Sequence, residues 1–374
     1  MKKIIEGFGL MTGMIIGAGL FALPYGFSKA PLHWNILLLV AVFLLSWFLH
    51  LLFAGIIYIT PGRHRFPGYV KKYLGHRAET IAAIFTILSA YGVMLVYGIL
   101  GSIFLGNIFQ IDFILAGIIF FALGGLLFLF SLDTIGKVDF YLTVLLLFFI
   151  VLISSKLFPA VNINNFHPPE NPTWFFSYGI LIFAFGGYSA LPDLRDIFGG
   201  NGGAISKKII FWSLFVAAVF YLIFIISVLG ASGGVVSEDA ISGLGGIIGP
   251  AAKLMGSIIG IIAVFRSYTV FGADLKLMFT YDYKLSKKSS WLLSFLPPVT
   301  FFLLGLVSLA DTLSIVGSVG LGVFAVFTFL MVYKKRKEIS SFVGFRPRGW
   351  LLFLLGALFV SGALYDIIKI SLLP

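Results

Sequence analysis

Eleven long apolar runs limit the possible folds of this chain more than any other feature. Each has about 20 residues or more, enough for an α-helix to cross a hydrocarbon core about 30 Å thick. The runs lack the two-residue alternation of a membrane β-barrel. They cover residues 7–30, 35–59, 79–105, 112–131, 139–158, 174–197, 207–230, 248–272, 289–309, 312–333 and 348–370. The sequence therefore predicts an all-α polytopic membrane protein with eleven transmembrane helices.

The composition supports this prediction and argues against other classes of protein. Of the 374 residues, 60% are hydrophobic and 11% are charged, whereas a soluble domain has about 25% charged residues. The sequence has no cysteine, no convincing metal-ligand spacing, no phosphate-binding loop and no Ser-His-Asp set. We therefore expect a protein that is not an enzyme and that holds no metal or cofactor. Because the connections are short, residues 1–374 are expected to form a single transmembrane domain.

The positive charges lie mainly on one side of the predicted membrane. Of the 26 Lys and Arg residues, 21 fall on the side of the N-terminus, and Arg266 lies within a helix. The four on the opposite side are Lys29, Lys156, Lys253 and Lys369. By the positive-inside rule, the N-terminus is expected in the cytoplasm and the C-terminus outside the cell membrane. The net charge of +11 then reflects topology and contact with anionic lipid, so we expect no nucleic-acid partner.

The first and sixth predicted helices share an unusual pattern. Each has a glycine, Gly19 or Gly187, five residues before the proline of an Ala-Leu-Pro tripeptide, and the two lie 168 residues apart. At this offset, three of the four following helices of the first half map close to helices of the second half. Because five helices are an odd number, the second copy must be inverted. The sequence predicts repeat one over about 7–158, repeat two over about 174–333, and an extra helix over about 348–370.

Inverted repeats with a helix interrupted in each copy are typical of secondary transporters that work by alternating access. Unwound backbone at membrane depth is tolerated where it faces protein or a watery cavity. The ends of the half-helices suit an amino acid, since N-terminal N–H groups attract a carboxylate and C-terminal carbonyls attract an ammonium group. Small-residue packing and proline kinks are the alternatives for either helix alone. A channel or a non-transporting sensor on the same fold is the alternative class.

Several motifs resemble a known family. They are Thr12–Pro24, Ala90-Tyr91, Phe183–Tyr188 followed by Leu191-Pro192, Ser267-Tyr268 with Gly272 and Asp274, and Phe295–Pro298. Together they are similar to the amino acid/auxin permease branch of the amino acid–polyamine–organocation superfamily, and most of all to bacterial tryptophan/tyrosine permeases. Tyr188 replaces the His often seen there. The resemblance implies a five-plus-five inverted-repeat fold and amino acid import driven by an ion gradient, but it does not fix the substrate. We expect a neutral, large hydrophobic or aromatic amino acid.

The two interruptions and one tyrosine are the expected substrate-binding residues. They are Ile16, Gly17, Ala18, Gly19, Tyr91, Phe183, Phe185, Gly186, Gly187 and Tyr188. The aromatic residues beside the second interruption could wall an apolar pocket, and the phenol of Tyr91 could reach a substrate carboxylate. The alternatives are generic packing for the aromatic rings and a single hydrogen-bond partner for Tyr91.

Arg266 and Ser267 are expected at a coupling-ion site or its substitute. In sodium-coupled relatives of this fold, hydroxyls at this level of helix eight hold Na⁺ together with carbonyls of the broken first helix. Ser267 is such a hydroxyl, but the charge of Arg266 would repel Na⁺ and could replace it. We therefore favour coupling to H⁺, or exchange, over Na⁺ symport. The alternatives for Arg266 are snorkelling to the interface and pairing with Asp193.

Further candidates concern the inner gate and the proton path. Lys2 and Lys3 lie just before the first helix, and Asp274 ends the eighth, so an ion pair between them could latch the inner side. The alternative is that both lysines only set the topology. His50 and Asp193 are the candidates for a proton acceptor, with an interhelical hydrogen bond as the alternative for His50.

Overall fold

The computed structural model describes residues 2–129, 135–233, 235–305 and 308–371, and this part of the chain is helical throughout its regular structure. The α-helices are α1 (Lys2–Ile15), α2 (Gly19–Ser28), α3 (Leu32–Ile59), α4 (Phe66–Leu74), α5 (His76–Phe109), α6 (Phe113–Leu127), α7 (Ile135–Leu157), α8 (Phe176–Ala184), α9 (Leu191–Phe198), α10 (Gly203–Ser232), α11 (Gly245–Ile248), α12 (Pro250–Leu277), α13 (Lys287–Leu304), α14 (Leu309–Ile315), α15 (Leu321–Val343) and α16 (Gly349–Ser371). Short 3₁₀ turns lie at Phe158–Ala160, Ile163–Phe166, Tyr188–Ala190 and Ser242–Leu244, and π-helical segments at Met278–Asp282 and Val316–Gly320.

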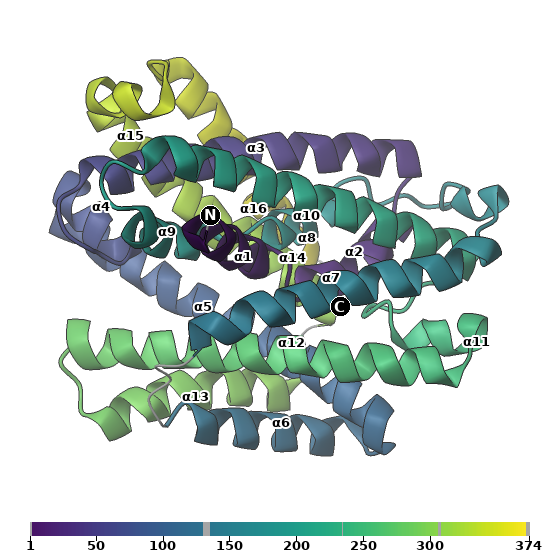
Figure 1. Ribbon diagram of the computed structural model, residues 1–374. Helices are drawn as coiled ribbons and strands as arrows, with labels where there is room; N and C mark the ends of the chain where they lie inside the picture. The colour runs from purple at the N-terminus through teal and green to yellow at the C-terminus, as the bar shows by residue number, and fades with distance from the viewer. Residues whose placement is uncertain (1, 130–134, 234, 306–307, 372–374) are drawn as a thin grey trace.

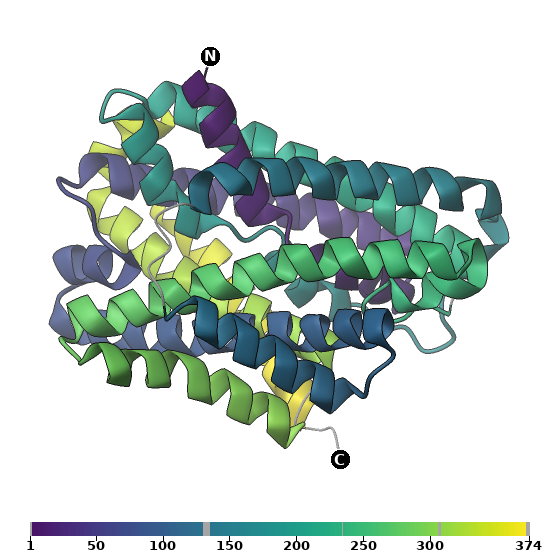
Figure 2. The same ribbon diagram turned by 60° about the horizontal axis from the view of Figure 1, so that its bottom comes forward.

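The long helices run roughly along one direction, as expected of a bundle that crosses a membrane (Figure 1). Helices α4 and α9 gather at one end of the bundle, and α11 lies at the other. Helix α5 packs along α12 and α6, α3 packs along α15, and α1 packs along α10. The turned view shows α6, α12 and α13 side by side on one face (Figure 2). The short helices α2 and α8 are mostly buried inside the bundle.

Seven helices in the described residues are long and apolar enough to cross a membrane, or eight if the bent pair α1 and α2 is one span. The predicted count of eleven is therefore not confirmed by length and hydropathy. The run 112–131 yields α6 with 15 residues, and 174–197 is divided into α8 and α9 with nine and eight. The run 289–309 becomes α13, which begins with four polar residues, Lys287 to Ser290.

Apolar side chains cover the outside of the bundle, while small residues allow close packing inside it. Phe353 on α16 is 80% exposed and Phe148 on α7 is 62% exposed, as expected where side chains face lipid. Inside, the ring of Phe121 on α6 lies directly over Gly98 on α5, where an added Cβ would sit 2.1 Å from it. Such contact between small residues and neighbouring helices is typical of membrane bundles.

Asn35 links three helices through hydrogen bonds. It is fully buried near the start of α3, and its Nδ2 donates to the carbonyl oxygens of Phe27 at 2.9 Å and Ala30 at 3.0 Å. Its Oδ1 accepts from the hydroxyl of Ser177 on α8. Three polar contacts thus join the end of α2, the start of α3 and the start of α8.

We expect Asn35→Leu to destabilise the protein by about 1–3 kcal/mol, because buried carbonyl and hydroxyl groups would lose their partner. The measurement is the temperature at which half of the detergent-solubilised protein loses its monodisperse chromatographic peak. Asn164→Leu, at an exposed position, is the control. Equal temperatures for wild type and Asn35→Leu would show that these contacts contribute nothing.

Candidate functional site

The first transmembrane segment is broken, as the sequence predicts. Helix α1 ends at Ile15, α2 begins at Gly19, and the two are bent by 47°. Residues 16–18 between them are not helical. The break therefore leaves helix-end carbonyl groups of α1 on one side and helix-start N–H groups of α2 on the other. Of the latter, the N–H groups of Leu20 and Phe21 donate to the carbonyls of Gly17 and Ala18 at 3.2 Å.

The segment containing α8 and α9 is broken at its matching place. Helix α8 ends at Ala184, and α9 begins at Leu191 after a single 3₁₀ turn. Ser189, in the intervening turn, is exposed. Gly187 has a φ of +124°, a conformation that residues with a Cβ rarely adopt. Gly187 is therefore needed at this break for its backbone conformation.

The two breaks touch each other. A Cβ added to Gly19 would lie 2.7 Å from the Cα of Ala184, and a Cβ added to Gly187 would lie 2.8 Å from Cγ1 of Ile15. Distances this short leave no room for a side chain. Both glycines therefore permit a close approach between the two broken segments.

Tyr221 on α10 joins the two breaks, and sequence reasoning missed it. Its hydroxyl is fully buried and lies 2.8 Å from the carbonyl oxygens of both Ile15 and Ala184. These are the last residues of α1 and α8, where helix carbonyls lack intrahelical donors. A tyrosine in a helix that is otherwise almost entirely apolar was the available signal, but it does not reveal which way the side chain points.

The ends of four half-helices converge around these breaks. Helices α1 and α8 contribute C-terminal ends with partial negative charge, while α2 and α9 contribute N-terminal ends with partial positive charge. An ammonium group and a carboxylate a few ångströms apart, as in a free amino acid, match this arrangement.

Tyr97 on α5, a second residue that the sequence analysis did not single out, borders the first break. A Cβ added to Gly17 would meet the Tyr97 hydroxyl oxygen at 3.9 Å, and no other described atom within 4 Å. The same hydroxyl interacts with the side chains of Ser267 and Arg266 on α12. The Ser267 hydroxyl also donates to the carbonyl of Ala263 at 3.0 Å. The structure thus brings Arg266 and Ser267 near the first break through Tyr97.

The predicted aromatic residues lie in different surroundings. Phe185 is fully buried and packs edge-on against Phe43 and Tyr221. Tyr188 stacks on Phe324 of α15, with ring centroids 3.7 Å apart. The Tyr91 hydroxyl donates to the carbonyl of Leu293 on α13 at 2.8 Å. Phe183, close to the second break, is half-buried.

The predicted gate residues do not form the expected pair in the described part of the chain. Lys2 and Lys3 are exposed, and no recorded ion pair links them to Asp274. At this end of the bundle Arg63 pairs instead with Asp193 and Asp196 of α9, and Arg65 pairs with Asp282. Asp274 lies within electrostatic reach of Arg63 and Arg65. Exposed pairs of this kind each contribute about 0–1 kcal/mol.

The two candidate proton acceptors are held differently. Nδ1 of His50 lies 2.7 Å from the carbonyl oxygen of Ser46, one turn earlier on α3, and the imidazole is fully buried. Asp193 lies in the first turn of α9, where its side chain is partly exposed and forms an ion pair with Arg63. The ion-pair partner of Asp193 in the structure is therefore Arg63.

Comparisons with known proteins agree with this geometry. Residues 1–364 match the tryptophan/tyrosine permease family. The tyrosine-specific transport system 1 of Haemophilus influenzae is 21% identical over 326 residues, which cover 81% of each chain. A closed nucleobase-cation-symport-1 family transporter with bound bromovinylhydantoin aligns with a TM-score of 0.69 and 12% identity, covering 98% of this chain and 92% of that one.

A manganese transporter of Eremococcus coleocola, solved in complex with an aromatic bis-isothiourea compound, aligns with a TM-score of 0.61 and 14% identity, covering 99% of this chain and 94% of that one. At these identities the two solved structures establish the fold alone. The match to the family spans nearly the whole sequence and both broken segments. The chain is therefore a multi-pass membrane transporter that belongs to the tryptophan/tyrosine permease family.

Proposed function

We propose that this protein is a secondary active transporter of large neutral amino acids, with tyrosine as the first candidate substrate. The contact between the two broken segments carries the proposal, because it gathers four half-helix ends around one position. The named activity of the Haemophilus influenzae relative supports an aromatic substrate. Alternating access would expose this position first to one side of the membrane and then to the other.

In the proposed binding mode, the substrate ammonium group faces the carbonyl ends of α1 and α8, and its carboxylate faces the first turn of α2. The open space beside Gly17 and the half-buried side chains of Phe183 and Tyr188 support placing the substrate here. The aromatic side chain of the substrate would extend towards the second break. Tyr91 of α5 remains a proposed substrate-site residue, and its hydrogen bond to Leu293 links α5 to α13.

The proposed topology has eleven crossings. Helices α1 to α7 form the first five-helix repeat, α8 to α15 form the inverted second repeat, and α16 is the additional helix. The matching breaks in the first and sixth crossings support the repeat. The excess of Lys and Arg on one side supports a cytoplasmic N-terminus and an external C-terminus in the cell membrane. The inner latch of Lys2 or Lys3 with Asp274, which is not formed among the described residues of this structure, is proposed for the outward-open state.

The test of the transport function is uptake of radiolabelled amino acids into proteoliposomes. We expect saturable tyrosine uptake and counterflow, with inhibition by phenylalanine and tryptophan and little inhibition by aspartate or lysine. Uptake no faster than in empty liposomes for all twenty amino acids would favour a sensor, while non-saturable flux would favour a channel.

We expect uptake to be independent of Na⁺ and to fall about tenfold or more in Arg266→Ala. Two unit charges about 4 Å apart interact by roughly 4 kcal/mol at an effective dielectric of 20, equivalent to about three orders of magnitude in Na⁺ affinity. Arg266 would act as a fixed cation near the C-terminal end of α1. Uptake is compared under matched Na⁺ and K⁺ gradients, each with and without a pH gradient.

Arg346→Ala, which removes an exposed guanidinium, is the control for the loss of one positive charge. Uptake that requires Na⁺ in the wild type would favour sodium symport, with Ser267 at a genuine ion site. Uptake accelerated by neither gradient, but by amino acid inside the vesicles, would favour exchange.

A further inference from the structure

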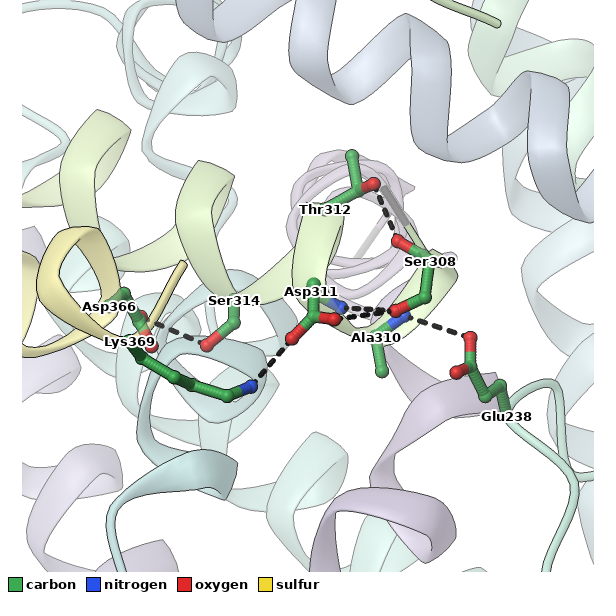
Figure 3. Close-up of polar contacts among 8 residues, drawn as sticks. All are labelled: Glu238, Ser308, Ala310, Asp311, Thr312, Ser314, Asp366 and Lys369. Atoms are coloured by element: carbon green, nitrogen blue, oxygen red, sulfur yellow. Dashed lines mark hydrogen bonds and ion pairs between the residues drawn. The ribbon is translucent and has the colours of Figure 1, made fainter. Parts of the chain in front are cut away.

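A buried carboxyl group lies outside the breaks, on the last helix. Asp366 of α16 is 1% exposed, and its Oδ2 accepts from the hydroxyl of Ser314 on α14 at 2.9 Å (Figure 3). The carboxyl also presses against α8, since a Cβ added to Gly179 would lie 2.7 Å from Oδ2. An acidic side chain enclosed by transmembrane helices is costly to keep charged and usually has a function.

Three buried oxygen atoms at this place have no hydrogen-bond partner in the described part of the chain: Asp366 Oδ1, the Ser318 hydroxyl and the Tyr178 hydroxyl. Ser318 is fully buried and Tyr178 is 8% exposed. Tyr178 interacts electrostatically with Asp366. The Ser318 hydroxyl lies close enough to interact with the carboxyl as a hydrogen-bond donor, although it does not meet strict hydrogen-bond geometry. A proton on Oδ1 would remove the buried charge and supply a donor, while hydroxyl oxygens can accept it.

Polar groups lie between this carboxyl and the end of the bundle near Glu238, in three separately hydrogen-bonded sets. Lys369, one helical turn after Asp366, donates to Asp311 Oδ1 at 2.6 Å, and the Ser308 hydroxyl donates to Asp311 Oδ2 at 2.9 Å. Glu238 accepts from the backbone N–H of Ala310 at 3.3 Å. Figure 3 shows the three sets, with Asp366 bonded to Ser314, Asp311 bonded to Lys369 and Ser308, and Glu238 bonded to Ala310.

Glu238 and Ser308 also line a hollow of about 310 Å³ between α5 and α13. The hollow thus borders Glu238 and Ser308 at this end of the bundle, and its other lining residues are apolar or glycine. In the proposed topology this is the outer side, from which protons would enter.

We propose that Asp366 is the proton-binding carboxyl through which a pH gradient drives transport. This rests on the proposed transport function and names its unassigned proton acceptor. The charged and titratable groups that face Asp366 are Tyr365 and Lys369 on α16, Asp311 on α14 and Tyr178 on α8. Helix α8 ends at the second break, so a change of charge at Asp366 acts on the helix that carries Ala184 to the substrate. Protonation of Asp366 thereby shifts the preferred position of α8, which forms one wall of the proposed substrate site.

The experiment compares wild type, Asp366→Asn and Asp112→Asn in proteoliposomes with radiolabelled tyrosine. Asn is close in size to a protonated Asp and cannot titrate, while Asp112 is an exposed N-cap of α6 and serves as the matched control. We expect Asp366→Asn to retain counterflow within about twofold but to lose acceleration by an inward proton gradient. The control should retain both. Proton-driven accumulation at the wild-type level in Asp366→Asn would overturn the proposal.

Infrared difference spectra recorded across a pH titration give a readout independent of transport. The wild type should show the carbonyl band of a protonated carboxylic acid that is missing from Asp366→Asn, and an unchanged band would overturn the assignment. If Asp366→Asn does not fold, Asp366→Glu replaces it, and the band should then move in frequency and titration midpoint. Absence of tyrosine uptake by the wild type would count against the proposed substrate. The spectra test the protonation of Asp366 whatever the substrate is.

Discussion

Replacing Gly19 with leucine is expected to reduce amino acid uptake below about a tenth of the wild-type rate, with normal membrane insertion. The first atom of the new side chain would already lie 2.7 Å from the Cα of Ala184. Backbone cannot give way as the end of a flexible side chain can, so the two broken segments would have to separate. Overpacking of this kind costs about 1–3 kcal/mol or more, and here the strain falls on the substrate site.

The control for this prediction is Gly246→Leu, since a Cβ at that exposed glycine meets no described atom within 4 Å. Both variants are measured for membrane expression, chromatographic homogeneity, tyrosine affinity and uptake. Gly187→Leu should resemble Gly19→Leu, because it adds strain at a positive φ to a contact of 2.8 Å with Ile15. Near-normal affinity and rate in both would mean that the close approach of the breaks is only a packing feature.

Tyr221→Phe is expected to lower uptake about tenfold or more while the protein remains folded. The change removes one oxygen and leaves the carbonyls of Ile15 and Ala184 without their shared donor. An unsatisfied buried polar group costs about 1–3 kcal/mol, and each 1.4 kcal/mol is about tenfold in an equilibrium constant. Because those carbonyls end α1 and α8, the loss should appear in substrate affinity and in the transport rate.

Tyr333→Phe removes a phenol from a side chain that is 52% exposed and provides the matched control. Binding is followed by scintillation proximity with radiolabelled tyrosine, and uptake is measured in the same preparation. A Tyr221→Phe variant with wild-type affinity and rate would show that water or substrate satisfies these carbonyls equally well.

The breaks were predictable from the sequence because their cause is local. Gly19 and Gly187 each precede a proline at the same spacing, and both residue types disturb a helix wherever they occur. The contact between the breaks was not predictable in the same way, since it depends on how segments 168 residues apart pack. The predicted number of spans was not confirmed where polar residues lower the hydropathy of a helix, as they do in the first turn of α13.

Tyr221 and Tyr97 escaped the sequence analysis for a related reason. Their helices are apolar on every side, so periodicity does not tell which face meets the breaks. Asp366 had a usable signal: an acidic residue within the predicted span 348–370. The rule that singled out Arg266, that ionisable residues inside a membrane are costly and functional, applies equally to this aspartate.

The ring-on-glycine contacts of the bundle restrict how this transporter can move. Phe121 and Phe120 of α6 cover Gly98 and Gly101 of α5, and a Cβ at either glycine would lie 2.1–2.2 Å from a ring carbon. Sliding α6 along α5 by about one helical turn would carry one of the two rings from its glycine onto Leu95 or Phe104, the next residues on the same face. These contacts therefore oppose shear of a full turn between α5 and α6. Rotation about hinges does not require such a slide, and the non-helical residues 16–18 and 185–187 can supply the hinges.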